Sequence, residues 1–198
     1  MRKVNRREMP VIFPLSSLSL VLASTIFAPN IAFSESIQVE QVFKEKGEVD
    51  FYASIRSGLF KVHGTNDQLT GTLSQSSEGL QGAFSIPMIQ FTTGSKMRDR
   101  HLNTKIFQSD QFSDGSMTLS PIVLTGKNYE GPFNGKLKFH GLEKDIFGLV
   151  KIQMKENGLV HHASFTIKLS DFNIPLPEFA GIKVLDEVKV EVDGRAAL

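Results

Sequence analysis

The sequence predicts an all-β protein, an eight-stranded antiparallel β-barrel with one or two short helices. Three observations predict this fold. Apolar and polar residues alternate with a period of two in successive segments from residue 35 onward, as in strands with one buried face. Turn-forming residues separate the segments at intervals of roughly 8 to 12 residues, which leaves no room for the crossover helices of a parallel sheet. Closing the sheet into a barrel removes its exposed edges.

Eight segments carry the alternation. In chain order, the expected strands lie within residues 49–55, 69–73, 80–88, 117–119, 133–139, 146–154, 163–169 and 184–192. The segment at 133–139 is typical, because Phe133, Leu137 and Phe139 share one parity and polar residues occupy the other. Turn residues are found at Lys46–Gly47, Gly64–Asp67, Ser77–Gly79, Gly126–Asn128, His140–Gly141 and Asn157–Gly158. Neighbouring strands are therefore expected to pair as antiparallel hairpins.

Two segments interrupt this pattern. Residues 95–102 contain no β-branched residue and begin with Ser95, a favourable N-cap residue, so a short helix is expected there. Residues 171–181 contain Pro175 and Pro177, and each proline removes a hydrogen bond from a strand ladder. This second segment is not expected to form a central strand.

Residues 1–34 have the organisation of a secretory signal peptide. Basic residues occupy positions 2, 3, 6 and 7, an apolar stretch follows, and Ala32 and Ser34 supply the small residues that signal peptidase requires. We therefore expect cleavage after Ser34, and a mature chain of residues 35–198 that forms a single domain in the periplasm. The alternative is an uncleaved membrane anchor, which a proline and four serines in the stretch disfavour. No transmembrane segment is expected in the mature chain.

Composition excludes several functional classes. The chain has no cysteine, which excludes disulfides, thiol catalysis and thiolate metal sites. Its 22 basic and 21 acidic residues nearly balance, which argues against a nucleic-acid partner. No nucleophile elbow, phosphate loop or zinc-protease motif is found. We therefore expect no catalytic residues, no metal site and no cofactor.

The five histidines are interpreted as surface or turn residues. Adjacent His161 and His162 fall in a predicted strand, where successive side chains point to opposite faces. The two side chains are therefore not expected to bind one metal ion together.

Phenylalanine is the most informative residue type. The chain has 16 Phe and no Trp, and 13 Phe remain after the three in the leader. Phe buries a large apolar area without a polar group that needs a partner, which suits a dry cavity for a hydrocarbon. The alternative is a packed interior, since an eight-stranded barrel can be filled by side chains or hold one ligand. Composition alone favours the packed interior.

Three stretches together resemble the YceI family of periplasmic lipid-binding proteins. Residues 91–94 (FTTG), 98–102 (RDRHL) and Phe107 are similar to the family's threonine-glycine segment, its Arg-Asp-x-His-Leu helix and the aromatic that follows. Residues 135–144 (GKLKFHGLEK) resemble a family hairpin, with Glu143 where threonine is usual. Residues 169–174 (LSDFNI) resemble a family turn, with Asn173 where glycine is usual. The stretches occur in family order across residues 37–193.

The resemblance implies a lipocalin-like barrel that encloses a long isoprenoid or fatty amphiphile and performs no catalysis. We expect the bound molecule to be a polyisoprenoid lipid or an isoprenoid quinone. The residues expected to line the lumen are Phe51, Phe84, Ile86, Phe139, Phe165 and Ile167. Arg98, Asp99 and His101 match the family's helix motif. Two roles are open for them, either contact with a lipid headgroup at the barrel mouth or a structural clip that holds the helix in place.

Two other functions remain open. The barrel could be solid and act through its loops as an interaction or stress-response protein without a bound lipid. It could also act as an isomerase or hydrolase on a lipid in the lumen, which would need a pair of polar residues facing inward. A homodimer is compatible with the sequence, which does not determine the oligomeric state.

Overall fold

The computed structural model describes residues 39–55, 61–179 and 182–198. The predicted leader and its cleavage site lie outside the described residues. The strands are β1 (Val39–Ile55), β2 (Lys61–Ser76), β3 (Gly79–Pro87), β4 (Asp114–Ile122), β5 (Asn128–Phe139), β6 (Leu142–Lys155), β7 (Gly158–Lys168), β8 (Glu178–Phe179) and β9 (Ile182–Ala197). One short α-helix, α1 (Lys96–His101), continues into a π-helical turn (Leu102–Ile106). Single 3₁₀ turns occupy Met88–Gln90 and Leu169–Phe172.

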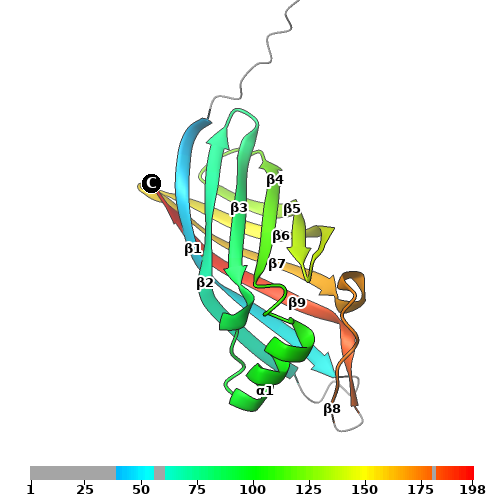
Figure 1. Ribbon diagram of the computed structural model, residues 1–198. Helices are drawn as coiled ribbons and strands as arrows, with labels where there is room; N and C mark the ends of the chain where they lie inside the picture. The colour runs from blue at the N-terminus through cyan, green and yellow to red at the C-terminus, as the bar shows by residue number, and fades with distance from the viewer. Residues whose placement is uncertain (1–38, 56–60, 180–181) are drawn as a thin grey trace, which may run out of the picture. The chain divides into compact units, whose positions relative to one another are not determined.

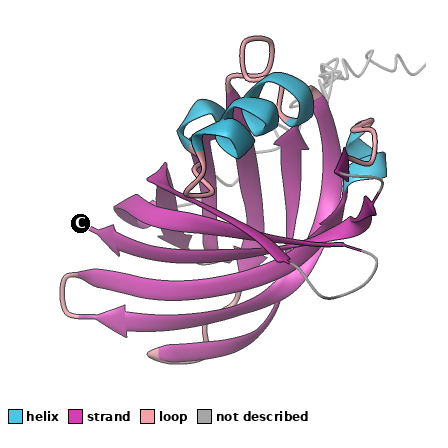
Figure 2. Ribbon diagram, turned by 90° about the horizontal axis from the view of Figure 1, so that it is seen from below, coloured by secondary structure: helices cyan, strands magenta, loops and turns pink. Residues whose placement is uncertain are grey.

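Eight of these strands form a closed antiparallel barrel (Figures 1 and 2). Each strand from β1 to β6 pairs with the next along the chain, and β9 pairs with both β7 and β1. The two-residue strand β8 pairs only with the start of β9. The prediction of an eight-stranded antiparallel barrel with one or two short helices is confirmed.

Two of the predicted turns are wrong, because they lie inside long strands. Lys46–Gly47 falls within β1 and Gly64–Asp67 within β2. The ladder between β1 and β2 shifts register here, with Gly47 opposite Leu69 but Val49 opposite Asn66. The buried Asn66 donates a hydrogen bond from Nδ2 to the carbonyl of Pro87 at 2.8 Å. The glycine and asparagine signals therefore mark a β-bulge, which uses the same residue types as a turn.

The predicted turn at His140–Gly141 is present as a two-residue hairpin connection between β5 and β6. Both residues have positive φ, 49° and 76°, which is the conformation of a type I′ turn. Asn173 also has a left-handed conformation, with φ 56°. Asparagine tolerates this region better than other non-glycine residues. This explains why Asn173 can stand where the resembling family has glycine.

The two ends of the barrel differ. Phe43, Leu73 and Leu80 are at most 2% exposed and fill the interior near the β2–β3 turn. At the opposite end, the chain leaves β3 and forms α1 before entering β4 (Figure 1). In the described part of the chain, no helix has the length and apolar character needed to cross a membrane. The barrel is thus packed at one end and bordered by a helical segment at the other.

Candidate functional site

A cavity of about 840 Å³ occupies the barrel interior. Its size falls within the range of roughly 300 to 1,000 Å³ that is usual for small-molecule sites. Its lining is almost entirely aliphatic and aromatic, and every barrel strand contributes to it. The interior is therefore not packed solid, and the expectation drawn from composition alone is wrong.

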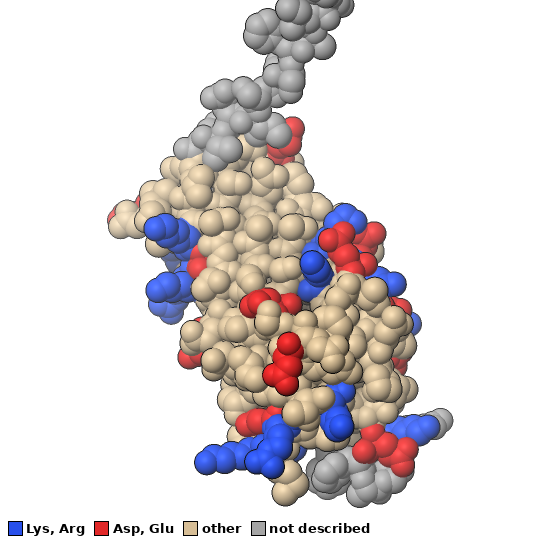
Figure 3. Space-filling view, viewed as in Figure 1, with Lys and Arg blue, Asp and Glu red and all other residues tan. Residues whose placement is uncertain are grey.

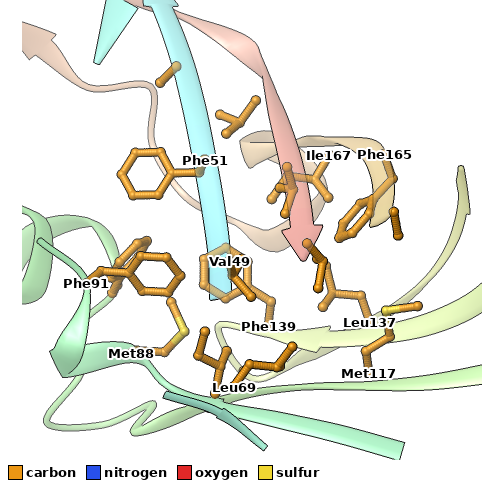
Figure 4. Close-up of a pocket in the computed structure, with 18 of the residues that line it drawn as sticks. Val49, Phe51, Leu69, Met88, Phe91, Met117, Leu137, Phe139, Phe165 and Ile167 are labelled. Carbon is orange, nitrogen blue, oxygen red and sulfur yellow. The ribbon is translucent and has the colours of Figure 1, made fainter. Parts of the chain in front are cut away.

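All six residues expected in the lumen line this cavity. They are Phe51 on β1, Phe84 and Ile86 on β3, Phe139 on β5, and Phe165 and Ile167 on β7. Figure 4 shows several of them around one space, together with side chains such as Met88, Met117 and Leu137. On β7 the alternation is plain, because Ala163, Phe165 and Ile167 line the cavity and the intervening residues do not. The parity of the strands thus places these side chains inside.

Aromatic rings outside the strands extend the lining toward α1. Phe91 lies before α1 and Phe107 after it, and their ring centroids are 5.5 Å apart. The ring centroid of Phe91 lies 5.6 Å from that of Phe51. The ring centroid of Phe107 lies 5.8 Å from that of Phe139. These two residues were not predicted as lumen residues, because alternation identifies inward positions only within strands. Their signal was the aromatic positions on either side of the predicted helix.

The structure shows what Asp99 does. Its carboxylate accepts hydrogen bonds from the N–H of Thr93 at 2.7 Å, from the Thr93 hydroxyl at 2.6 Å and from the Thr92 hydroxyl at 2.9 Å. Thr92 in turn forms a β-bridge with Thr65 of β2. Asp99 does not line the cavity, and it fastens the start of α1 to the barrel wall. Ser95, the expected N-cap residue, forms no capping bond through its side chain.

The pKa of Asp99 reflects these contacts. Burial raises the pKa, but the hydrogen bonds from Thr93 and Thr92 and the nearby Arg98 charge outweigh burial, and the pKa is lowered from 3.8. Asp99 is therefore a carboxylate at neutral pH, when the anchor of α1 is fully formed.

Arg98 and His101 border the opening of the cavity. Both line it and both are exposed, and the neighbouring Met97 is 79% exposed. Arg98 donates two hydrogen bonds to Thr93, from Nη2 to the carbonyl at 2.9 Å and from Nε to the hydroxyl at 3.2 Å. Arg98 thus takes part in the structural clip together with Asp99. Because Arg98 also lies at the opening, its contact with a lipid headgroup stays a prediction.

A buried polar pair lies inside the barrel, away from α1. His161 Nε2 is 3.0 Å from Glu45 Oε1, and the two side chains are 9% and 0% exposed. His161 lines the cavity, so its interpretation as a surface or turn residue is wrong. His162 points the other way and pairs with the exposed Asp193 at 2.9 Å. The strand thus separates the two histidines, as its geometry requires.

The sequence did contain a signal for this pair. Glu45 has the same parity as Phe43 and Val49 on β1, and His161 the same parity as Ala163 on β7. A charged or titratable residue on the apolar parity of a strand predicts an inward polar group. Among the described residues, no cluster of three or more His, Asp or Glu side chains could hold a metal ion.

Comparisons with known proteins agree with this architecture. A family model described as "YceI-like domain" matches residues 41–196. No curated protein matches the chain. A polyisoprenoid binding domain from Saccharophagus degradans, implicated in plant cell wall breakdown, is 15% identical with a TM-score of 0.65, covering 79% of this chain and 99% of that one. BcnA of Burkholderia cenocepacia is 17% identical with a TM-score of 0.63, covering 82% of this chain and all of that one (100%). At these identities the likeness shows a shared fold.

Proposed function

Because the chain belongs to the YceI-like family, we propose that it is a non-catalytic binding protein that holds one long amphiphilic lipid in its barrel. The lipid is of the polyisoprenoid or isoprenoid-quinone type. The observation that carries the proposal is the apolar cavity of about 840 Å³, which runs from the opening beside α1 into the barrel interior. The solved relative from Saccharophagus degradans, which is described as polyisoprenoid binding, supports the choice of ligand class.

The lining suits a long branched hydrocarbon. Burial of each CH₂ group contributes about 0.8 kcal/mol, so a chain of many carbons needs few polar contacts to be held. Aromatic rings such as Phe51, Phe91 and Phe165 provide large contact areas without polar groups that would need partners. Exposed Arg98 and His101 at the opening can meet a polar group there.

The proposed place of action is the periplasm, reached through the signal peptide of residues 1–34. The order of basic, apolar and small residues in this segment supports export. On the surface shown in Figure 3, basic and acidic side chains are interspersed, which suits a small-molecule carrier better than a protein that holds a polyanion.

Lipid extraction tests the proposal. Protein purified from the exporting compartment is extracted with organic solvent, and the extract is analysed by mass spectrometry against the protein amount. We expect about one amphiphile per chain, as one cavity allows. Reproducible absence of lipid, together with failure to bind added prenyl lipids, would contradict the carrier function and favour a barrel that acts through its surface.

A matched pair of variants on β7 gives the control. Ile167→Trp fills part of the cavity and is expected to lower the amount of bound lipid, because Ile167 lines it. Thr166→Trp adds the same side chain at the neighbouring exposed position and should leave bound lipid unchanged. Equal lipid content in both variants would show that the lipid does not occupy the lumen.

A further inference from the structure

The buried pair of Glu45 and His161 has no role in the packing of an apolar cavity. The residues lie 116 positions apart, on β1 and β7, and their side chains meet over β9, the strand between them. Burying a titratable pair is unfavourable unless its hydrogen-bonding groups are satisfied. We therefore ask whether a bound ligand satisfies the remaining hydrogen-bonding groups of this pair, since His161 lines the cavity.

The strand beneath the pair is shaped to accept it. Gly194 of β9 lies directly opposite His161 in the ladder, and Ala196 lies opposite Glu45. A Cβ at Gly194 would clash with both Glu45 Oε1 and His161 Nε2. The absence of a side chain at Gly194 therefore provides the space in which the carboxylate and the imidazole meet.

The pair leaves two hydrogen-bond acceptors unfilled. In the tautomer of His161 that donates from Nε2 to Glu45 Oε1, the ring carries a lone pair on Nδ1. His161 Nδ1 has no hydrogen-bond partner among the described residues, and neither has the buried Glu45 Oε2. His161 borders the cavity close to Phe84, with ring centroids 6.4 Å apart. A group that enters the cavity would satisfy the acceptor on His161 by donating a hydrogen bond to it.

We propose that His161, positioned by Glu45, is an inner subsite that accepts a hydrogen bond from a hydroxyl group of the bound lipid. This inference rests on the proposed lipid-binding function and narrows its ligand class to amphiphiles with a free hydroxyl, such as a polyisoprenoid alcohol. The hydroxyl-bearing end lies in the inner half of the cavity beside Phe84, and the apolar chain extends toward Phe51 and Phe91 at the α1 end.

A matched ligand pair tests the subsite. Geranylgeraniol and its methyl ether have the same chain and the same oxygen, but only the alcohol can donate a hydrogen bond. Competition of each compound against a fluorescent fatty probe gives the two affinities in delipidated protein. We expect the alcohol to bind about tenfold more tightly, which is the net effect of one hydrogen bond.

Variants assign the preference to the pair. Replacing both partners in Glu45→Leu/His161→Phe removes the polar groups together, and the affinities of alcohol and ether should become equal. Glu45→Gln can still hold the imidazole through its amide oxygen, so it should keep most of the preference and show that Glu45 is a positioning residue. His162→Phe on the outer face should keep the full preference.

The outcomes separate this inference from the proposed function. Tight binding of both compounds without discrimination in the wild-type protein overturns the hydroxyl subsite and leaves lipid binding intact. Full preference retained in the double variant also overturns it. Failure of both compounds to bind contradicts the proposed lipid-binding function itself. Should the double variant not fold, the wild-type affinity ratio still tests the inference, because equal affinities for the alcohol and the ether overturn it.

Discussion

Asp99 of α1 accepts hydrogen bonds from both the backbone N–H and the hydroxyl of Thr93, at 2.7 and 2.6 Å. This one carboxylate thus links the loop after β3 to helix α1. The helical segment that borders the cavity opening is held by this contact, because Ser95 provides no cap. The contribution of the α1 anchor to the free energy of unfolding should therefore depend on the charge of Asp99.

The first prediction concerns pH. The pKa of Asp99 is lowered in the folded protein from 3.8, so the carboxylate contributes stability that is present above that pH and is lost as the pH falls through the folded-state pKa. Asp99→Asn should lower the free energy of unfolding at pH 7 by about 1 kcal/mol. Thermal melts from pH 7 to pH 3 should show this difference shrinking below about pH 4. Asp110→Asn, an exposed change nearby, is the control, and a difference independent of pH would contradict the role of Asp99.

The second prediction concerns Arg98. Its two hydrogen bonds to Thr93 favour the clip, so Arg98→Gln should reduce apo stability by up to about 1 kcal/mol, with lipid affinity falling only to a similar extent. Melting of delipidated protein and lipid titration measure the two quantities. A large loss of affinity with an unchanged apo melting temperature would instead assign Arg98 to a headgroup.

The third prediction concerns the aromatic lining. Phe84 is only partly buried by protein and faces the cavity, so Phe84→Ala should lower lipid affinity at least tenfold, because about 1.5 to 3 kcal/mol of burial is lost. The decrease in melting temperature caused by Phe84→Ala should be greater in lipid-loaded than in delipidated protein, since bound ligand stabilises the folded state. Phe147→Ala is the control, because Phe147 is 70% exposed on the outer face.

The same comparison should give a different result at two other positions. Phe139 and Phe165 line the cavity but are also packed, at 7% and 8% exposure. Alanine there should reduce apo stability by about 3 to 5 kcal/mol in addition to weakening lipid retention. Equal melting losses in loaded and delipidated protein at all three positions would count against a lipid tail at these side chains.

The fourth prediction concerns Gly194. A methyl group here meets the Glu45–His161 pair, so Gly194→Ala should lower the free energy of unfolding by about 1 to 3 kcal/mol. Gly126→Ala places the same group in open space and should stay within about 0.5 kcal/mol of wild type. Urea unfolding of both variants provides the measurement. An unaffected Gly194→Ala protein would mean that the pair can move apart without loss.

The fifth prediction concerns export. Intact mass spectrometry of protein from the periplasmic fraction should give a chain that begins at or near Glu35, because Ala32 and Ser34 supply the small residues of the cleavage site. A protein that retains Met1 and sediments with membranes would contradict both cleavage and the periplasmic location.

The sequence predicted the barrel well because strand alternation is a local signal. On β5 and β7 every second residue must face the interior, so parity alone identified Phe139, Phe165 and Ile167. Strand lengths were predicted less well. Glycine and asparagine at Gly47 and Asn66 serve a bulge inside two long strands, and a bulge and a turn demand the same backbone freedom.

The polar parts of the site depend on tertiary contacts that the sequence does not reveal. The parity of Glu45 and His161 indicates that each side chain faces inward, but it does not reveal their contact, because the two residues lie 116 positions apart on strands that are not neighbours. The sequence could not separate the headgroup and clip roles of Arg98 either. The clip depends on the folded position of the Thr93 carbonyl relative to the Arg98 side chain.

The closure of the barrel by β9 has a kinetic consequence. β9 pairs with β1 from Lys44↔Ala197 to Ile55↔Val184, so the pairing that seals the cavity joins segments from opposite ends of the described chain. Contacts of such sequence separation form slowly, in the range of milliseconds to seconds for all-β domains. Until they form, β1 and β7 each expose a free edge that can recruit another chain. The half-closed barrel, in which β9 has not yet docked, is therefore the folding species most exposed to aggregation.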